Sequence, residues 1–323
     1  MPTTDPTCSI RIRGVTKRFG PQVAMGGLDL DIPRGSLCGL LGPNGAGKST
    51  TIRMIMSIIH PDEGSLEVLG STALAAKDRI GYLPEERGLY RKMKVGEFLR
   101  YVGRLKGLST REARRSAAEW LERLELPGVL AKRCEELSKG MQQKVQFAAA
   151  VMHEPELLIL DEPFSGLDPV NARTLVAALE EIHARGATIL FSTHQMHQAE
   201  ALCDRIVLFD RGRKILDETL ESIRARFDPR TLVVEPIAPD EPEAAARLAS
   251  IAGVESIERI GEAFELRLAP SADPAAALAA AAAAIPLRGA TLRRTSLDDV
   301  FVDLVGEHPE AIERRRLAEA NAA

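Results

Sequence analysis

Residues 42–50 read Gly-Pro-Asn-Gly-Ala-Gly-Lys-Ser-Thr, and this stretch decides the fold. It follows the apolar run 37–41 and precedes the helical-looking residues 51–59. Glycines let successive backbone amides turn inward around phosphate oxygens, and the N-terminus of a following helix adds partial positive charge. The stretch therefore predicts a phosphate-binding loop rather than an ordinary glycine-rich turn.

The residue types of this loop have separate tasks. The Lys48 ammonium is expected to reach the outer phosphates, and the Ser49 hydroxyl is placed to ligate Mg²⁺. We assign phosphate binding to the following loop residues: Gly42, Asn44, Gly45, Ala46, Gly47, Lys48, Ser49 and Thr50.

Composition is that of a compact, soluble protein. The 323 residues carry 42 basic and 46 acidic side chains, and a formal net charge of −4 argues against a general nucleic-acid binder. The four cysteines are scattered, which is unlike a zinc site or a disulfide scaffold and agrees with a reducing cytosol. No apolar run approaches the roughly 20 residues that span a bilayer. We therefore expect any membrane role to depend on a partner.

The first 220 or so residues alternate short apolar runs with helical stretches, which predicts an α/β sheet covered by helices. The expected strands are 9–13, 37–41, 64–68, 157–160, 188–192 and 205–210. Residues 95–137 contain no strand-like run, and their periodicity predicts a helical insertion with helices at 97–107 and 110–124. In open parallel sheets, ligands gather beyond the carboxyl ends of the strands.

Three polar side chains follow such strand ends directly. The buried run 157–160 delivers Asp161 and Glu162, and two adjacent carboxylates are costly there unless a cation or a reaction uses them. We predict that Asp161 holds the metal and that Glu162 orients or deprotonates an attacking water. His194 ends the run 188–193 and is placed to hydrogen-bond a terminal phosphate. Glu162 and His194 are therefore the predicted catalytic residues.

With these residues in place, the chain resembles the nucleotide-binding subunit of an ATP-binding-cassette (ABC) transporter over about residues 10–227. Leu137-Ser138-Lys139-Gly140-Met141 resembles the family signature motif and opens a helix expected at 142–153. The resemblance implies that Ser138 and Gly140 cap the γ-phosphate held by a second subunit, so that two subunits dimerise around two Mg·ATP. It further implies that Asp168, in the motif 165–168, contacts the opposite site and that Phe19 stacks on adenine.

Two motifs depart from the usual family pattern. In Ile80-Gly81-Tyr82-Leu83-Pro84-Glu85 the family usually has Gln at the last position, where the residue reaches the metal. A carboxylate there adds negative charge beside a triphosphate, so nucleotide binding should depend strongly on Mg²⁺. The neighbouring Glu86 is an alternative for the same role. In the signature, Lys139 replaces a Gly and Met141 replaces a Gln. The predicted metal-site residues are thus Ser49, Glu85 and Asp161.

A second domain follows the break at 227–229. Its pattern of strands at 231–235, 254–260, 263–268 and 290–294, with helices at 241–250 and 274–285, predicts a β-α-β-β-α-β, ferredoxin-like α+β unit. A final amphipathic helix is expected at 297–305. The predicted domains are therefore a P-loop ATPase domain at 1–227 with its helical subdomain at about 86–137, an accessory domain at 228–305 and a charged tail at 306–323. This organisation and the motifs at 82–90 and 137–144 resemble the branch of NatA-type sodium exporter ATPases.

The resemblance implies a cytosolic ATPase that binds ATP and Mg²⁺, forms a homodimer or heterodimer, and drives a separately encoded integral-membrane permease, with export as the expected direction. Such a subunit is peripheral on the inner face of the membrane and binds no nucleic acid. ABC-fold translation factors with two cassettes, and chromosome ATPases with long coiled coils, do not fit this sequence. The alternative is a regulatory or interaction module that binds ATP with little turnover. The cargo is not encoded in these motifs.

Overall fold

The computed structural model describes residues 7–86, 88–228, 230–238 and 243–305. Two compact units are distinguished by their internal packing, one continuing to Leu220 and the other comprising Glu221–Asp303. The sequence places the boundary slightly later, at residues 227 and 228, and that boundary stays a prediction. The expected tail 306–323 lies outside the described residues.

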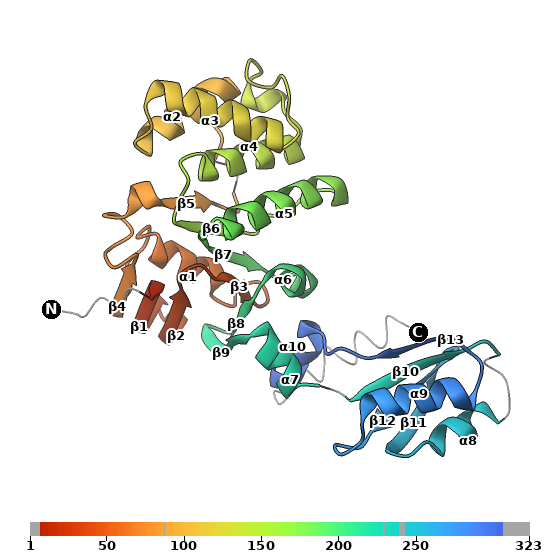
Figure 1. Ribbon diagram of the computed structural model, residues 1–323. Helices are drawn as coiled ribbons and strands as arrows, with labels where there is room; N and C mark the ends of the chain where they lie inside the picture. The colour runs from red at the N-terminus through yellow and green to blue at the C-terminus, as the bar shows by residue number, and fades with distance from the viewer. Residues whose placement is uncertain (1–6, 87, 229, 239–242, 306–323) are drawn as a thin grey trace. The chain divides into compact units, whose positions relative to one another are not determined.

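The centre of the first unit is a six-stranded sheet in the order β5-β6-β7-β3-β8-β9 (Figure 1). Its strands are β3 (Leu37–Leu41), β5 (Ile80–Leu83), β6 (Leu157–Asp161), β7 (Thr188–Thr193), β8 (Arg205–Asp210) and β9 (Arg213–Thr219). All neighbours pair in parallel except β9, which is antiparallel to β8. The predicted parallel sheet is confirmed, and its carboxyl edge carries the phosphate loop after β3 and the carboxylates of β6.

A separate antiparallel sheet flanks this core in the order β2-β1-β4. It consists of β1 (Cys8–Phe19), β2 (Gln22–Pro33) and β4 (Glu63–Val68). The sequence places 9–13 and 64–68 among the strands of the α/β sheet, and this assignment is wrong. Both segments belong to the antiparallel sheet, in which β1 pairs with β4 on one side and with β2 on the other, and this sheet packs its apolar face on α1 and the core.

Helices cover both faces of the parallel sheet. The helices of the first unit outside the insertion include α1 (Lys48–Ile55), α5 (Pro169–Ala184) and α6 (Met196–Leu202). Side chains alternate across a strand, so Cys38 and Leu40 join α1 in the main apolar cluster, while Gly39 faces α6. A Cβ atom on Gly39 would lie 3.5 Å from the Cβ of Ala199, which shows how closely α6 approaches β3.

The predicted helical insertion is present and contains α2 (Val95–Leu105) and α3 (Thr110–Arg123), which pack on each other and on α4 (Lys139–Val151). Short 3₁₀ turns occupy Lys77–Arg79 and Cys134–Glu136. Helix α3 begins after Ser109, whose hydroxyl accepts from the Glu112 amide in a capping box. Helix α4 begins three residues earlier than the predicted Gln142, because the Ser138 hydroxyl accepts from the Met141 amide and caps it.

The second unit contains a four-stranded antiparallel sheet in the order β11-β12-β10-β13, the order of a ferredoxin-like fold. Its elements are β10 (Thr231–Pro236), α8 (Ala244–Ala249), β11 (Val254–Ile260), β12 (Ala263–Leu268), α9 (Pro274–Ala284) and β13 (Leu287–Leu292), flanked by α7 (Leu220–Arg226) and α10 (Leu297–Val305). The predicted β-α-β-β-α-β order is confirmed. Residues 241 and 242 of the expected helix 241–250 lie outside the described residues, and β13 begins before the predicted 290.

Candidate active site

The phosphate loop joins β3 to α1 and depends on glycine at two close approaches. Gly42 has φ 143°, and a Cβ there would lie 2.2 Å from the Phe209 carbonyl oxygen. Gly47 has φ 109°, and a Cβ there would lie 2.7 Å from the Met25 methyl group. Because α1 starts at Lys48, the amides of its first turn have no acceptor within the helix. These amides are placed as the predicted anion site requires, and anion binding there stays a prediction.

The Lys48 side chain is buried and bends back over its own loop. Its ammonium donates to the Gly42 carbonyl at 2.6 Å and to the Pro43 carbonyl at 3.1 Å. Burial lowers the pKa of this ammonium, while the carboxylates of Glu162 and Asp161 oppose that shift. The charge is thus held at the mouth of the loop, where phosphate oxygens would approach.

Asp161 is the last residue of β6, and it is 2% exposed. Its Oδ1 accepts from the Ser49 hydroxyl at 3.3 Å and from the Ser192 hydroxyl of the adjacent β7. The pair of Ser49 and Asp161 therefore offers a hydroxyl and a carboxylate oxygen in one place, the hard oxygen donors that Mg²⁺ prefers. Within the described part of the chain, no group of three or more His, Cys, Asp or Glu side chains could hold a metal ion. A cation here would complete its shell with phosphate oxygens and water.

Glu162 leaves the strand in a left-handed conformation with φ 49°, which is uncommon for a residue other than glycine. Its backbone amide donates to Ser192, and its carboxylate accepts at Oε2 from the Thr193 hydroxyl at 3.3 Å. The His194 amide donates to Oε1 at 3.1 Å. The end of β7 therefore holds the Glu162 carboxylate in one orientation. Glu162 also lines the cavity described below.

The His194 ring also contacts this carboxylate, with Nδ1 at 2.8 Å from Oε1 of Glu162. A carboxylate only accepts hydrogen bonds, so Nδ1 carries the proton. In the neutral ring, Nε2 is then an acceptor. Donation from Nε2 to a phosphate, the role that the sequence predicts, requires the imidazolium form.

A cavity of about 630 Å³ is lined by most of the predicted loop residues and by Glu162, but not by Asp161 or His194. It is lined by Phe19, Gln22, Val23, Ala24, Asn44, Gly45, Gly47, Lys48, Ser49, Thr50, Glu85, Glu162, Arg211 and Gly212. The structure thus brings the loop, the predicted adenine-stacking ring and the predicted catalytic carboxylate of Glu162 to one space. Of the two carboxylates that the sequence leaves as alternatives, Glu85 lines this cavity and Glu86 does not.

Five of the lining residues are missing from the sequence prediction: Gln22, Val23, Ala24, Arg211 and Gly212. The first three begin β2, and the other two form the turn between β8 and β9. These segments carry no phosphate motif of their own. Their place at the site follows from tertiary packing, because Gly212 donates to the Ala46 carbonyl at 3.0 Å.

The structure does not bring the predicted signature residues to this cavity. Ser138 and Asp168 are exposed at the N-termini of α4 and α5, where each side chain caps its own helix. The backbone amide and the side-chain amide of Asn171 donate to the Asp168 carboxylate, as does the backbone amide of Val170, and these bonds hold its pKa below the usual value. Gly140 lies near Asn171, because a Cβ atom on Gly140 would be 3.4 Å from the side-chain amide nitrogen of Asn171. Within one chain, these residues therefore form a second polar surface apart from the phosphate loop.

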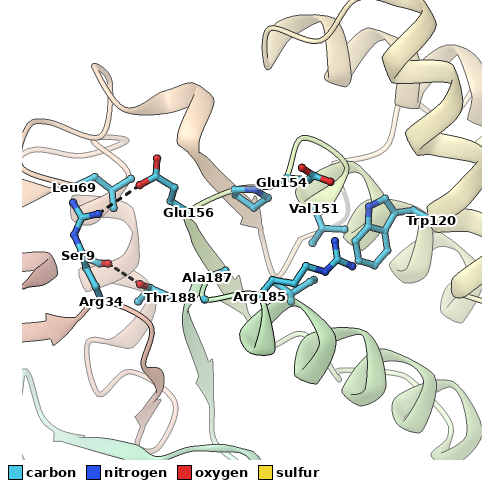
Figure 2. Close-up of a pocket in the computed structure, with 13 residues that line it drawn as sticks. Ser9, Arg34, Leu69, Trp120, Val151, Glu154, Glu156, Arg185, Ala187 and Thr188 are labelled. Atoms are coloured by element: carbon cyan, nitrogen blue, oxygen red, sulfur yellow. Dashed lines mark hydrogen bonds and ion pairs between the residues drawn. The ribbon is translucent and has the colours of Figure 1, made fainter.

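A different cavity, of about 330 Å³, lies at the amino ends of β6 and β7, the sheet edge opposite to the phosphate loop. Figure 2 shows Ser9 bonded to Thr188 and Arg34 paired with Glu156 on one side, with Trp120 of α3 on the other. None of the sequence-predicted site residues lines it. Its two arginines and two glutamates leave it without a dominant charge.

Within the residues that the structure describes, no helix has the length and apolar character needed to cross a membrane. Two family descriptions match the chain: "ABC transporter" over residues 25–165, and "ATP-binding protein DrrA1-3-like, C-terminal domain" over residues 219–305.

Known proteins resemble this chain in sequence and fold. It is 48% identical over 226 residues to the uncharacterized ABC transporter ATP-binding protein YhaQ of Bacillus subtilis (strain 168), covering 70% of this chain and 76% of that protein. It is 34% identical over 308 residues to the daunorubicin resistance ATP-binding protein DrrA3 of Streptomyces coeruleorubidus, and this match covers 93% of this chain and 96% of that protein. A solved dimeric, post-hydrolysis state of the ATP-binding cassette MJ0796, bound to ADP and Pi, is 26% identical with a TM-score of 0.61, covering 65% of this chain and 98% of that one.

Proposed function

The chain belongs to the family of ABC transporter ATP-binding proteins, and from this premise we propose that it hydrolyses ATP with Glu162 to drive a membrane permease encoded as a separate chain. One observation carries the proposal. Glu162 lines the same cavity as Lys48 and Ser49, so a carboxylate faces the place where the phosphate loop would hold the outer phosphate. The test is steady-state ATP turnover by the purified chain and by its Glu162→Gln variant.

The proposed reaction is attack of water on the γ-phosphorus. Glu162 would orient and deprotonate this water, and its fixed hydrogen bonds to Thr193 and His194 keep the carboxylate in one position. Lys48 and the first-turn amides of α1 would stabilise the negative charge on the phosphate oxygens. A Mg²⁺ ion held by Ser49 and Asp161 would neutralise phosphate charge and orient the triphosphate.

We propose that two ATPase subunits enclose the nucleotides between them. Ser138 and Gly140 lie at an exposed helix N-terminus that is well suited to an anion but does not reach the cavity of its own chain. In a dimer, this N-terminus would cap the phosphate bound by the partner, and the adjacent Asp168 would lie at the shared surface. The MJ0796 structure is dimeric and bound to ADP and Pi, which supports dimerisation of this chain. A homodimer and a heterodimer with a related subunit both satisfy this geometry.

We propose that the partner in the membrane is an integral-membrane permease, and that the chain is cytoplasmic and binds at the inner face of the membrane. Export is the proposed direction, because the match to the daunorubicin resistance protein DrrA3 spans 93% of this chain and its accessory domain matches the DrrA1-3-like domain. The cargo depends on the permease, and sodium, a drug and a lipid all stay open.

The permease proposal has its own experiment. The tagged chain is purified in detergent from membranes of its own host, and an integral-membrane protein should be retained in stoichiometric amount. Adding back that protein in lipid vesicles should change the ATP turnover of the purified chain. Recovery of the chain without any such partner would contradict the proposal.

A further inference from the structure

The turn between β8 and β9 contains two residues, Arg211 and Gly212, and the strands close on the pair Asp210 and Arg213. Both turn residues have positive φ angles, 46° for Arg211 and 74° for Gly212. Two-residue hairpins with this geometry favour Asn-Gly or Gly-Gly, because a side chain such as that of arginine is strained there. An arginine in this position therefore calls for an explanation other than turn formation.

The backbone of the turn is fixed against the phosphate loop. The Gly212 amide donates to the Ala46 carbonyl at 3.0 Å, and the Gly212 carbonyl accepts from the Gly26 amide at 3.0 Å. A Cβ on Gly212 would lie 2.7 Å from the Ala24 carbonyl oxygen, so this position has no room for a side chain. The only side chain that the turn can present to the cavity is that of Arg211, which lines it.

The positive charge of the Arg211 side chain matters for nucleotide binding. The charged residues that line the cavity are Lys48 and Arg211 on one hand, and Glu85 and Glu162 on the other. A nucleotide brings several negative charges to a space that already has two carboxylates, and a third, Asp161, is hydrogen-bonded to the lining residue Ser49. Without Arg211, the lining would have a net negative charge and would oppose nucleotide binding.

The position of the turn indicates which part of the nucleotide it would meet. Glu162 sits at the ends of β6 and β7, where the outer phosphate is expected. The turn instead contacts Ala24 and Gly26 of β2, next to the cavity residues Gln22 and Val23 and on the side of the predicted adenine-stacking ring of Phe19. Arg211 is therefore closer to the inner part of the nucleotide.

We propose that Arg211 is a nucleotide-binding residue that contacts the inner phosphates of a nucleoside di- or triphosphate. The inference rests on the proposed ATP site and adds a residue from the β8–β9 turn to it. Because ATP and ADP share these phosphates, Arg211 contributes equally to the binding of both. The strained left-handed conformation is retained because it aims the guanidinium at the nucleotide.

The experiment compares the full-length chain with Arg211→Asn by calorimetric titration of Mg·ATP and Mg·ADP. Asparagine suits the left-handed turn, so the variant should fold and melt at the wild-type temperature or above. We expect both dissociation constants to rise about three- to tenfold, as befits a charge that is half exposed. The rise should shrink in 0.5 M NaCl, and Arg211→Lys should recover part of the affinity. Arg213→Asn is the matched control, since Arg213 is an exposed arginine of the same hairpin outside the cavity.

The outcomes separate the claims. Wild-type affinities for both nucleotides in Arg211→Asn would overturn the inference while leaving the ATP site in place. A loss confined to ATP would put Arg211 at the outer phosphate and would likewise overturn it. An equal loss in Arg213→Asn would reduce the effect to general charge. Failure of the wild-type chain to bind any nucleotide would instead contradict the proposed function.

Discussion

Nδ1 of His194 lies 2.8 Å from Oε1 of Glu162, and the backbone amide of His194 donates to the same oxygen at 3.1 Å. One residue thus fixes the carboxylate twice, once through a rigid backbone group and once through its ring. The sequence predicts both residues at the ends of neighbouring strands. Their direct contact indicates that His194 orients Glu162 in addition to any contact with phosphate.

Removing the ring should therefore impair hydrolysis more than binding. We expect His194→Ala to slow single-turnover ATP hydrolysis about ten- to hundredfold, because the carboxylate loses one of its orienting donors. The dissociation constant for Mg·ATP should change little. His197→Ala is the control, since His197 is exposed on α6 and outside the cavity. Equal turnover in the two variants would exclude an orienting role for His194.

Blocking hydrolysis should reveal the dimer. In Glu162→Gln, ATP is bound but is not consumed, so ATP-bound dimers should accumulate. Light scattering of the purified variant should give about 35 kDa without nucleotide, the mass of one chain, and about twice that mass with Mg·ATP. Adding Ser138→Ala and Gly140→Asp should abolish the ATP-dependent dimer. A monomer at saturating ATP would contradict the shared-nucleotide arrangement, and so would a dimer that survives the signature changes.

Lys48 should contribute to binding itself. Lys48→Ala removes a charge-assisted contact with the outer phosphates, and we expect the affinity for Mg·ATP to fall about ten- to hundredfold. The affinity for AMP, which lacks those phosphates, should fall much less. Lys77→Ala, which alters an exposed lysine outside the cavity, should match the wild type. Unchanged ATP affinity in Lys48→Ala would overturn the assignment of the phosphate loop.

Glu85 should make nucleotide binding depend on the metal. Its carboxylate lines the cavity, so Glu85→Gln should strengthen ATP binding in EDTA by about two- to tenfold and narrow the gap between metal-free and Mg²⁺-bound affinities. Titrations with and without Mg²⁺ measure that gap. Glu86→Gln is the matched control, because Glu86 is exposed and does not line the cavity. A gap of wild-type size in Glu85→Gln would reject this role.

Sequence patterns predict the buried strands of the parallel sheet well. The bounds of β3 and β8 agree with the prediction, because each is an apolar run that ends where polar or glycine-rich residues begin. The same sequence patterns do not predict the strands β2, β5 and β9. The four-residue β5 is short and contains a glycine, and the edge strand β9 has only two apolar residues, Ile215 and Leu216, between charged pairs. Such strands are stabilised by pairing with neighbours rather than by a local signal.

The same distinction applies to the residues of the candidate site. The phosphate loop, the carboxylates after β6 and the histidine after β7 each follow a recognisable run, so their meeting at one sheet edge can be predicted. Arg211 reaches the cavity only because Gly212 packs against Ala46 and Gly26, and no local pattern contains that information. The choice between Glu85 and Glu86 likewise depends on the path of the chain after β5.

The most direct test of the account is the steady-state rate of ATP hydrolysis by the purified wild-type chain and by Glu162→Gln, both at saturating Mg·ATP. The account predicts measurable turnover by the wild-type chain and a rate lower by about 10²-fold or more in the variant, with ATP affinity preserved, because only assistance to the attacking water is removed. Near wild-type turnover in Glu162→Gln would contradict the role of this carboxylate. ATP binding without turnover by the wild-type chain would identify a nucleotide-binding regulatory module instead of an ATPase.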